Sequence, residues 1–430
     1  MKRMFKNASV VFGGRTVTGL MGLASISLAA RALGVEKLGV FAMIQAYIII
    51  ADKLLNFQCW QAIIKFGADF LKQNKKEELK SLAKFCTILD AATAVVGTVL
   101  AAVIVYFFGN WKGWQQQTIY AVMLYSLRIL FNLQGTPTGL LRLFDKFKLI
   151  AAATITAATL KLILSVLGYL YSGNLMTFVI IWLSASIVES LFVLIAGWWQ
   201  INRNIGGNFL AAKLGIMARD KHLWKFVLST NLNQSVQLAS IEIDTLVIGA
   251  MLGTAATGIY KIAKQFTVIL AQLVEPVYQA IYPEMSHLAA EKRFTELKHI
   301  VAKTAIITGS ATLLIWFGFI LFGKWILNIT AGAEYVQGWS VMIIYMFAYV
   351  IWGFSFPLPA GLLAIGKAGK CLLGQLIALA VFLPSIYLLA VNFGLIGATC
   401  AQIVFFVVYA VFMLLFFNKY TSALKPDFLF

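Results

Sequence analysis

Long, predominantly apolar stretches constrain this chain more than any other feature of its sequence. Ala91–Phe108, Leu149–Tyr171 and Gly374–Phe393 are each long enough to cross the hydrocarbon core of a bilayer as a helix. Hydrophobic residues make up 61% of the chain and charged residues only 12%, far from the averages of soluble domains. The sequence therefore predicts an all-α polytopic membrane protein.

Hydropathy predicts twelve membrane-spanning helices. They lie near residues 8–30, 39–64, 84–108, 116–140, 149–172, 175–200, 226–251, 258–283, 301–323, 338–364, 371–391 and 393–417. An even number of spans places both termini on the same side of the membrane.

The basic residues predict which side that is. Of the 35 lysines and arginines, 25 fall on the side of the termini, four on the opposite side and six inside spans. Because cytoplasmic loops collect Lys and Arg, both termini are expected in the cytoplasm. Most of the net charge of +18 then reflects topology, so no nucleic acid partner is expected.

An internal repeat predicts that the chain is built from two similar halves. Leu33-Gly34 followed by Gly39-Val40-Phe41 recurs as Leu252-Gly253 followed by Gly258-Ile259-Tyr260, an offset of 219 residues, half the chain. We expect an N-terminal lobe (residues 1–200, spans 1–6), a basic cytoplasmic linker (201–225) and a C-terminal lobe (226–430, spans 7–12). Six spans per lobe give parallel topologies related by a pseudo-two-fold axis along the membrane normal, as in transporters with a substrate path between repeats.

Charged residues inside the spans are functional candidates, because a charge at membrane depth is costly unless it faces a cavity or a partner. The basic ones are Arg15, Lys53, Arg128, Lys161, Lys261 and Lys264, and the acidic ones are Asp52, Asp90, Glu189, Glu242, Asp244 and Glu275. Internal ion pairing is the alternative, with Asp52 beside a lysine, Lys264 beside Glu275, and Arg128 or Lys161 beside Asp90 or Glu189.

Helical geometry groups several polar side chains on shared faces. The groups are Asp52, Lys53, Asn56 and Trp60 in span 2; Gln234, Gln237 and Asp244 in span 7; and Lys261, Lys264 and Glu275 in span 8. These spans also carry the clearest repeat, so their polar faces are expected to line a shared cavity. The cations themselves are not repeated between the halves, which favours a role in substrate binding over a role in folding.

Catalytic and metal-binding patterns are weak in this chain. The four cysteines are scattered without paired spacing, and the three histidines lie in or beside predicted cytoplasmic loops. Gly135-Thr136-Pro137-Thr138-Gly139 lacks the Lys-Ser/Thr of a phosphate loop and is interpreted as the end of span 4. We therefore expect a transporter rather than an enzyme, with no catalytic residue, metal or other cofactor, driven by an ion gradient (H⁺ or Na⁺), the membrane potential or substrate flux.

The first repeat resembles a family motif. Ala29-Ala30-Arg31-Ala32-Leu33-Gly34 with Gly39-Val40-Phe41 is similar to the opening of the multidrug/oligosaccharidyl-lipid/polysaccharide (MOP) exporter superfamily, and the chain looks most like its Wzx-type polysaccharide and O-antigen flippases. The resemblance implies a MATE-like fold of two six-helix lobes around a V-shaped central cavity that opens alternately to each side.

The resemblance also implies a substrate and a place for it. The expected activity is export of an undecaprenyl-pyrophosphate-linked oligosaccharide repeat unit across the bacterial inner membrane, for lipopolysaccharide O-antigen or capsule-type polysaccharide, alongside a polysaccharide polymerase and other assembly proteins. Related flippases place cavity cations on spans 1, 2 and 8, which implies such a role for Arg15, Lys53 and Lys264. Lys261 lies on the same face of span 8 as Lys264 and is therefore also expected to contact the pyrophosphate. Trp60 is expected to lie beside the sugar.

Two other functions stay open at this point. A cation-coupled multidrug or small-molecule exporter of the same fold would use acidic cavity residues, for which Asp52 and Asp244 are suitable. A membrane scaffold that transports nothing would leave six intramembrane cations unexplained.

Overall fold

The computed structural model describes residues 2–206, 209–214 and 220–422. Within helices, the description leaves out the side chains of residues 2–13, 15–16, 210, 232–241, 272–273, 275–276 and 278–280. The regular elements of the described residues are all helical, which confirms the predicted fold class.

Twelve α-helices and two short 3₁₀ helices make up this part of the chain. In order they are α1 (Lys2–Leu55), α2 (Trp60–Lys72), α3 (Lys76–Trp111), α4 (Gln116–Phe131), α5 (Gly135–Leu143), α6 (Phe147–Leu170), α7 (Leu175–Ile205), η1 (Phe209–Ala211), α8 (Lys221–Ala290), α9 (Phe294–Thr330), η3 (Ala333–Gly338), α10 (Trp339–Ser355), α11 (Pro357–Ala364) and α12 (Ala368–Ser422).

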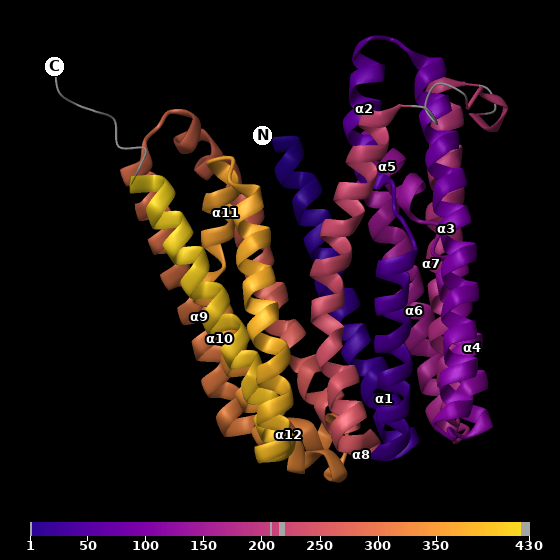
Figure 1. Cartoon of the computed structure of the whole chain (residues 1–430), viewed down its shortest axis with the longest axis vertical. Helices are drawn as coiled ribbons and strands as arrows, with labels where there is room; N and C mark the ends of the chain where they lie inside the picture. The colour runs from indigo at the N-terminus through magenta and orange to yellow at the C-terminus, as the bar shows by residue number, and fades with distance from the viewer. Residues whose placement is uncertain (1, 207–208, 215–219, 423–430) are drawn as a thin grey trace. The chain divides into compact units, whose positions relative to one another are not determined.

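Three of these helices are too long to be straight. The 54 residues of α1 would extend about 80 Å as one rod, more than twice the roughly 30 Å of a bilayer core. Non-helical backbone at Gly34 in α1 and Gly253 in α8, with φ of 70° and 85°, divides each helix into two arms. Gly394 does the same in α12, whose orange and yellow arms lie side by side in Figure 1.

The helices are those of a multi-pass membrane protein. In the described part of the chain, eight helical stretches are long and apolar enough to cross a bilayer. Large apolar side chains such as Phe107, Leu314 and Leu321 are exposed, as expected for surfaces that contact lipid. Each of the twelve expected spans overlaps one or more helices, but the number that crosses the membrane stays a prediction.

The chain forms two compact units. Unit 1 comprises residues 1–8, 34–39 and 247–430, and unit 2 comprises residues 9–33 and 40–246. In unit 1, α10 packs against α9 and α12; in unit 2, α6 packs against α7 and α3 against α4. Unit 2 includes the first arm of α8, where Asn231 Oδ1 accepts a 2.8 Å hydrogen bond from the Gln58 amide. The expected lobes, residues 1–200 and 226–430, remain a prediction.

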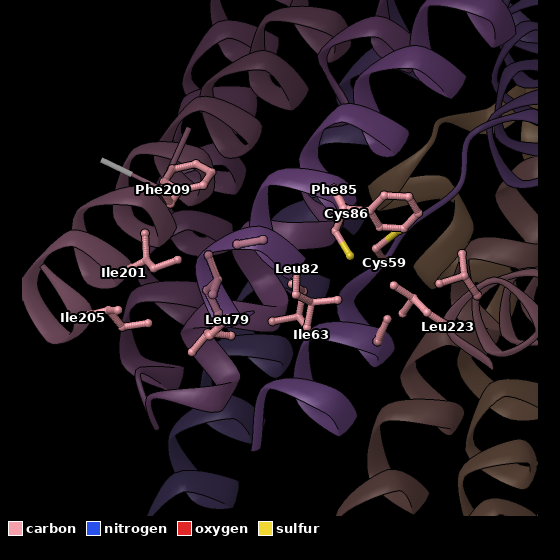
Figure 2. Close-up of a cluster of buried hydrophobic side chains, with 14 residues drawn as sticks. Cys59, Ile63, Leu79, Leu82, Phe85, Cys86, Ile201, Ile205, Phe209 and Leu223 are labelled. Carbon is pink, nitrogen blue, oxygen red and sulfur yellow. The ribbon is translucent and has the colours of Figure 1, made fainter. Parts of the chain in front are cut away.

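Each unit contains a hydrophobic core at corresponding places in the repeat. In unit 2, side chains of α2, α3, the end of α7 and the start of α8 meet around Leu79 and Leu82 (Figure 2). In unit 1, Leu297 and Val301 are buried in a core formed with α11 and α12. An offset of 218 residues relates Leu79 to Leu297, and an offset of 219 relates Leu82 to Val301. Duplication therefore preserved the packing as well as the motif.

A close backbone crossing inside unit 1 explains the repeated glycines. A methyl group added at Gly39 would collide with the Thr254 carbonyl, and one added at Gly258 would collide with the Val35 carbonyl. The repeat relates Gly39 to Gly258 and Val35 to Thr254, so the two contacts are equivalent and reciprocal. Only glycine permits this approach at either position.

We expect Gly39→Ala and Gly258→Ala each to destabilise the protein by about 1–3 kcal/mol, because an added methyl group overpacks the crossing. The double variant should lose less than the sum of the single losses, since either change opens the same contact. Thermal unfolding in detergent measures both effects. The control is Gly318→Ala in α9, where an added methyl group meets nothing within 4 Å. Equal midpoints for all three single variants would contradict this account.

Candidate functional site

Two predicted spans of unit 2 are interrupted. The helix expected over 39–64 ends at Leu55 and resumes at Trp60, and the one expected over 116–140 ends at Phe131 and resumes at Gly135. The prediction of continuous helices is therefore wrong at both places. An interrupted helix leaves backbone N–H and C=O groups without helical partners, and in a membrane the protein itself must satisfy them.

Asp90 of α3 satisfies backbone groups at both interruptions. Its carboxylate is buried; Oδ1 accepts from the Cys59 amide at 3.0 Å, and Oδ2 accepts from the Thr136 amide and hydroxyl, each at 2.8 Å. Cys59 immediately precedes α2, and Thr136 lies in the first turn of α5. One carboxylate therefore caps the N-termini of two helices, where amide donors and the helix dipole favour a negative charge.

Neutral side chains accept hydrogen bonds from two further amides of the first interruption. The Phe57 amide donates to Thr93 Oγ1 at 3.1 Å, and the Gln58 amide donates to Asn231 Oδ1 at 2.8 Å. Asn231 is itself buried and anchored through its Nδ2 to the Val227 carbonyl. The break is thus a defined structure, held by α3 and by the first arm of α8.

Asp52 is the centre of a second buried cluster at the same two breaks. Asn56 Nδ2 donates to its Oδ1 at 3.0 Å, and Asn132 Nδ2 donates to its Oδ2 at 2.7 Å. Asn56 Nδ2 also lies 3.3 Å from the Asn132 carbonyl oxygen. Lys53 Nζ lies 3.7 Å from Asp52 Oδ2, so the ion pair of Asp52 with a lysine, kept open above, is present.

Arg128 extends this cluster along α4. It lies one turn before Asn132, and its charge interacts with Asp52, Glu189 and Glu242. Glu189 interacts in turn with Lys161, whose ammonium lies 5.4 Å from the centre of the Trp182 ring. Of the two acidic partners expected for Arg128 and Lys161, the structure provides Glu189, because Asp90 is occupied by backbone donors.

One nitrogen of the Arg128 guanidinium makes no hydrogen bond within the described part of the chain. Its Nη1 is buried and has no hydrogen-bond partner among the residues that the structure describes. A buried donor without a hydrogen bond costs free energy. The planar guanidinium matches the geometry of the oxygens of a phosphate or carboxylate. This atom is therefore a candidate contact for an anionic ligand.

In the structure, two predicted site residues, Trp60 and Asp244, contact neighbouring side chains of the protein. The Trp60 ring lies 4.5 Å from the Arg142 guanidinium carbon. Asp244 is fully buried, and its Oδ1 accepts from the Thr245 amide at 2.6 Å and from the Thr245 hydroxyl at 3.1 Å. The binding roles of Trp60 and Asp244 remain predictions.

The second group of predicted cations lies on the other unit. Lys264 is buried and Lys261 is half-buried, both on the second arm of α8 in unit 1. A cavity shared by these lysines and Lys53 remains a prediction. The remaining predicted site residues, Arg15, Gln234, Gln237 and Glu275, lie outside the described side chains.

Comparison with known proteins decides the family. A family described as "polysaccharide biosynthesis protein" matches residues 4–289, more than half of the chain. The chain belongs to the polysaccharide biosynthesis protein family. The breaks at 56–59 and 132–134, with the clusters of Asp90, Asp52 and Arg128, all lie inside the matched region.

Curated relatives agree with this membership. The chain is 25% identical to the inner membrane protein YghQ of Escherichia coli over 79% of its own length and 96% of that protein. It is 24% identical to the probable low-salt glycan biosynthesis flippase Agl15 of Haloferax volcanii, over 42% of this chain and 38% of Agl15. It is 23% identical to the capsular polysaccharide biosynthesis protein CapF of Staphylococcus aureus, over 71% of this chain and 74% of CapF.

Solved structures show which fold this family member has. An inward-facing MATE family multidrug resistance transporter of the MOP superfamily matches with a TM-score of 0.79 and 17% identity, over 98% of this chain and 100% of the transporter. The lipid II flippase MurJ in an inward closed conformation matches with a TM-score of 0.74 and 15% identity, over 97% of this chain and 90% of MurJ. The expected MOP fold is thereby confirmed.

Some site residues of this family member carried no recognised sequence signal. Asn132, Thr136 and Asn231 are neutral and scarcely change the hydropathy of their spans. The signal that existed was Gly135-Thr136-Pro137-Thr138-Gly139, interpreted above as the end of a span. In the structure this motif begins α5, with Pro137 in its first turn, where a missing amide proton costs nothing.

We expect Asp90→Ala to reduce stability sharply, since three hydrogen-bond donors lose their acceptor and each buried unsatisfied group costs about 1–3 kcal/mol. Asp90→Asn keeps one acceptor oxygen and should lie between Asp90→Ala and the wild type. The measurement is the unfolding midpoint, with the yield of monodisperse protein in detergent. Asp69→Ala, at an exposed position on α2, is the matched control. A midpoint for Asp90→Ala equal to that of the control would show that the carboxylate does not hold the breaks.

Proposed function

We propose that this protein is a flippase that carries an undecaprenyl-pyrophosphate-linked oligosaccharide repeat unit from the inner to the outer leaflet of a bacterial inner membrane. The product would feed surface polysaccharide assembly of the O-antigen or capsule type. Membership in the polysaccharide biosynthesis family and the MOP fold support this proposal. The observation that carries it is the charged, hydrogen-bonded network at membrane depth around Asp52 and Arg128.

Interrupted helices suit this activity. In many transporters, substrate and ion sites lie where membrane helices are discontinuous, because the exposed backbone and nearby polar side chains provide binding groups. Here two discontinuities are joined by Asn56 and Asn132. Amides and carboxylates of this kind are suited to sugar hydroxyls, and Arg128 Nη1 provides a donor for a phosphate oxygen.

Lys53 is positioned to exchange partners. At 3.7 Å its ammonium is paired with Asp52 but is beyond ordinary hydrogen-bond length, and its side chain is 25% exposed. Asp52 keeps two amide donors without it. A diphosphate can therefore take Lys53 from Asp52 while the fold keeps its own hydrogen bonds.

Lys261 and Lys264 of unit 1 are proposed as further contacts for the diphosphate. A diphosphate in a low-dielectric environment requires compensating cations, and both lysines lie on a predicted span. Arg15 on the first span is assigned the same role. Cytoplasmic termini are part of the proposal, and the distribution of Lys and Arg supports them.

A cation-coupled exporter of small molecules is the second candidate. The observation that favours it is the complete burial of Asp52 and Asp244, two carboxylates at membrane depth that could bind a proton or Na⁺. In this case, expression in a pump-deficient host would lower the accumulation of a cationic dye in an ion-dependent manner. The flippase proposal expects no such decrease.

We expect Lys53→Ala and Lys264→Ala each to reduce surface polysaccharide display at least ten-fold, because a charge-assisted hydrogen bond to a phosphate is worth about 1.5–3 kcal/mol. Lys53→Arg should retain part of the activity. Display is measured in a strain that lacks the chromosomal gene, with immunoblotting of membranes to establish equal protein levels.

The control for these variants is Lys72→Ala, which removes an exposed lysine at the end of α2. It should display polysaccharide as the wild type does. Normal display by both Lys53→Ala and Lys264→Ala at normal protein levels would refute the cation site.

A further inference from the structure

The outer surface of unit 1 carries a groove of about 550 Å³ between helices α9, α10, α11 and α12. Its lining is almost entirely apolar. The small side chains of Ala302, Ala305 and Ala410 line the groove, and Phe354 contributes an aromatic ring. The volume lies within the range of pockets that hold small ligands.

Several apolar side chains in and beside the groove are exposed. Val411 and Leu414 line it and are 47% and 48% exposed, and Ile306 and Ile307 beside it on α9 are 62% and 54% exposed. In a membrane protein such side chains contact hydrocarbon. A hydrocarbon chain is therefore the ligand that this opening admits.

Polarity changes along the groove. The lining extends from Lys298 to Ala305 on α9 and from Asn418 back to Ala410 on α12. The groove is therefore about 10–12 Å long, measured along either helix. This is slightly less than one leaflet of a hydrocarbon core about 30 Å thick. Lys298 and Asn418 mark one end, and the other lining residues, apart from the buried Ser355, are apolar.

Lys298 gives the polar end a positive charge. Its ammonium donates to Ser422 Oγ at 3.1 Å, and no carboxylate of the described residues forms an ion pair with it. Exposed Lys419 follows Asn418 directly on α12 and adds a second positive charge. The basic residues of this end match the level at which anionic headgroups concentrate in the cytoplasmic leaflet.

We propose that this groove is a binding site for an anionic glycerophospholipid, with one acyl chain along Ala302, Ala305 and Ala410 and the phosphate beside Lys298. The site is independent of the proposed flippase cavity, because it uses none of the residues assigned to substrate. The lipid fills a surface hollow that would otherwise leave apolar side chains poorly packed. It also holds the end of α12 against the start of α9.

The test uses full-length protein that has been delipidated in detergent. Phosphatidylglycerol, phosphatidylcholine and undecaprenyl phosphate are added separately, and native mass spectrometry counts retained lipids while thermal unfolding reports stabilisation. We expect one tightly retained phosphatidylglycerol and at least five-fold weaker retention of phosphatidylcholine. Equal retention of these two lipids, or retention of undecaprenyl phosphate alone, would overturn the proposal.

Variants locate the site. Lys298→Gln should weaken phosphatidylglycerol retention at least five-fold, and Ala305→Trp, which fills the groove, should abolish it. Lys303→Gln and Ile306→Trp change neighbouring positions outside the lining and should bind as the wild type does. If Ala305→Trp fails to fold, Ala302→Phe fills the same space. Wild-type retention by a folded groove-filling variant would show that the lipid binds elsewhere.

Discussion

The buried carboxylate of Asp90 is the interaction on which the rest of unit 2 depends. A membrane offers no water to amides that leave a helix, so each interruption requires a protein acceptor. Asp90 supplies acceptors to both interruptions from a single position on α3. Without it, α2 and α5 would begin with unsatisfied donors in the middle of the unit. Because both breaks are tied to one side chain, their relative position is fixed, and this brings Asn56 and Asn132 within reach of Asp52.

The glycine repeat has a geometrical explanation of the same kind. Gly34 and Gly253 are the residues at which two long helices change direction, and Gly39 and Gly258 are the residues at which the following arms cross. Repeated residues therefore lie where backbone conformation or backbone approach excludes a side chain. The intramembrane cations are absent from the repeated set, since neither constraint involves them. Duplication of the scaffold left each half free to acquire different charged side chains.

Most of the fold could be predicted from the sequence, because helices in a membrane are dictated by length and hydropathy. The breaks at 56–59 and 132–134 could not, since an interruption of three or four residues barely alters the hydropathy of a span. The intramembrane charges were identifiable one by one, as Asp52, Asp90 and Arg128 show. Their partners were not, because Asn132, Thr136 and Asn231 come from other helices and lack a charge that would mark them.

Asp52 has two kinds of partner, asparagine amides and a lysine, and the difference between them matters for folding and for the proposed function. Two asparagine amides satisfy its carboxylate at 3.0 and 2.7 Å, whereas Lys53 approaches only to 3.7 Å. The short contacts are neutral-donor hydrogen bonds that hold the breaks together, and the long contact is an ion pair. In the proposed function, an anionic substrate would compete for the cation and leave the amides in place, so binding would not require the buried framework to open. A network in which Lys53 supplied the short contact would couple substrate binding to loss of structure. The observed geometry separates the two, which is what repeated cycles of binding and release require.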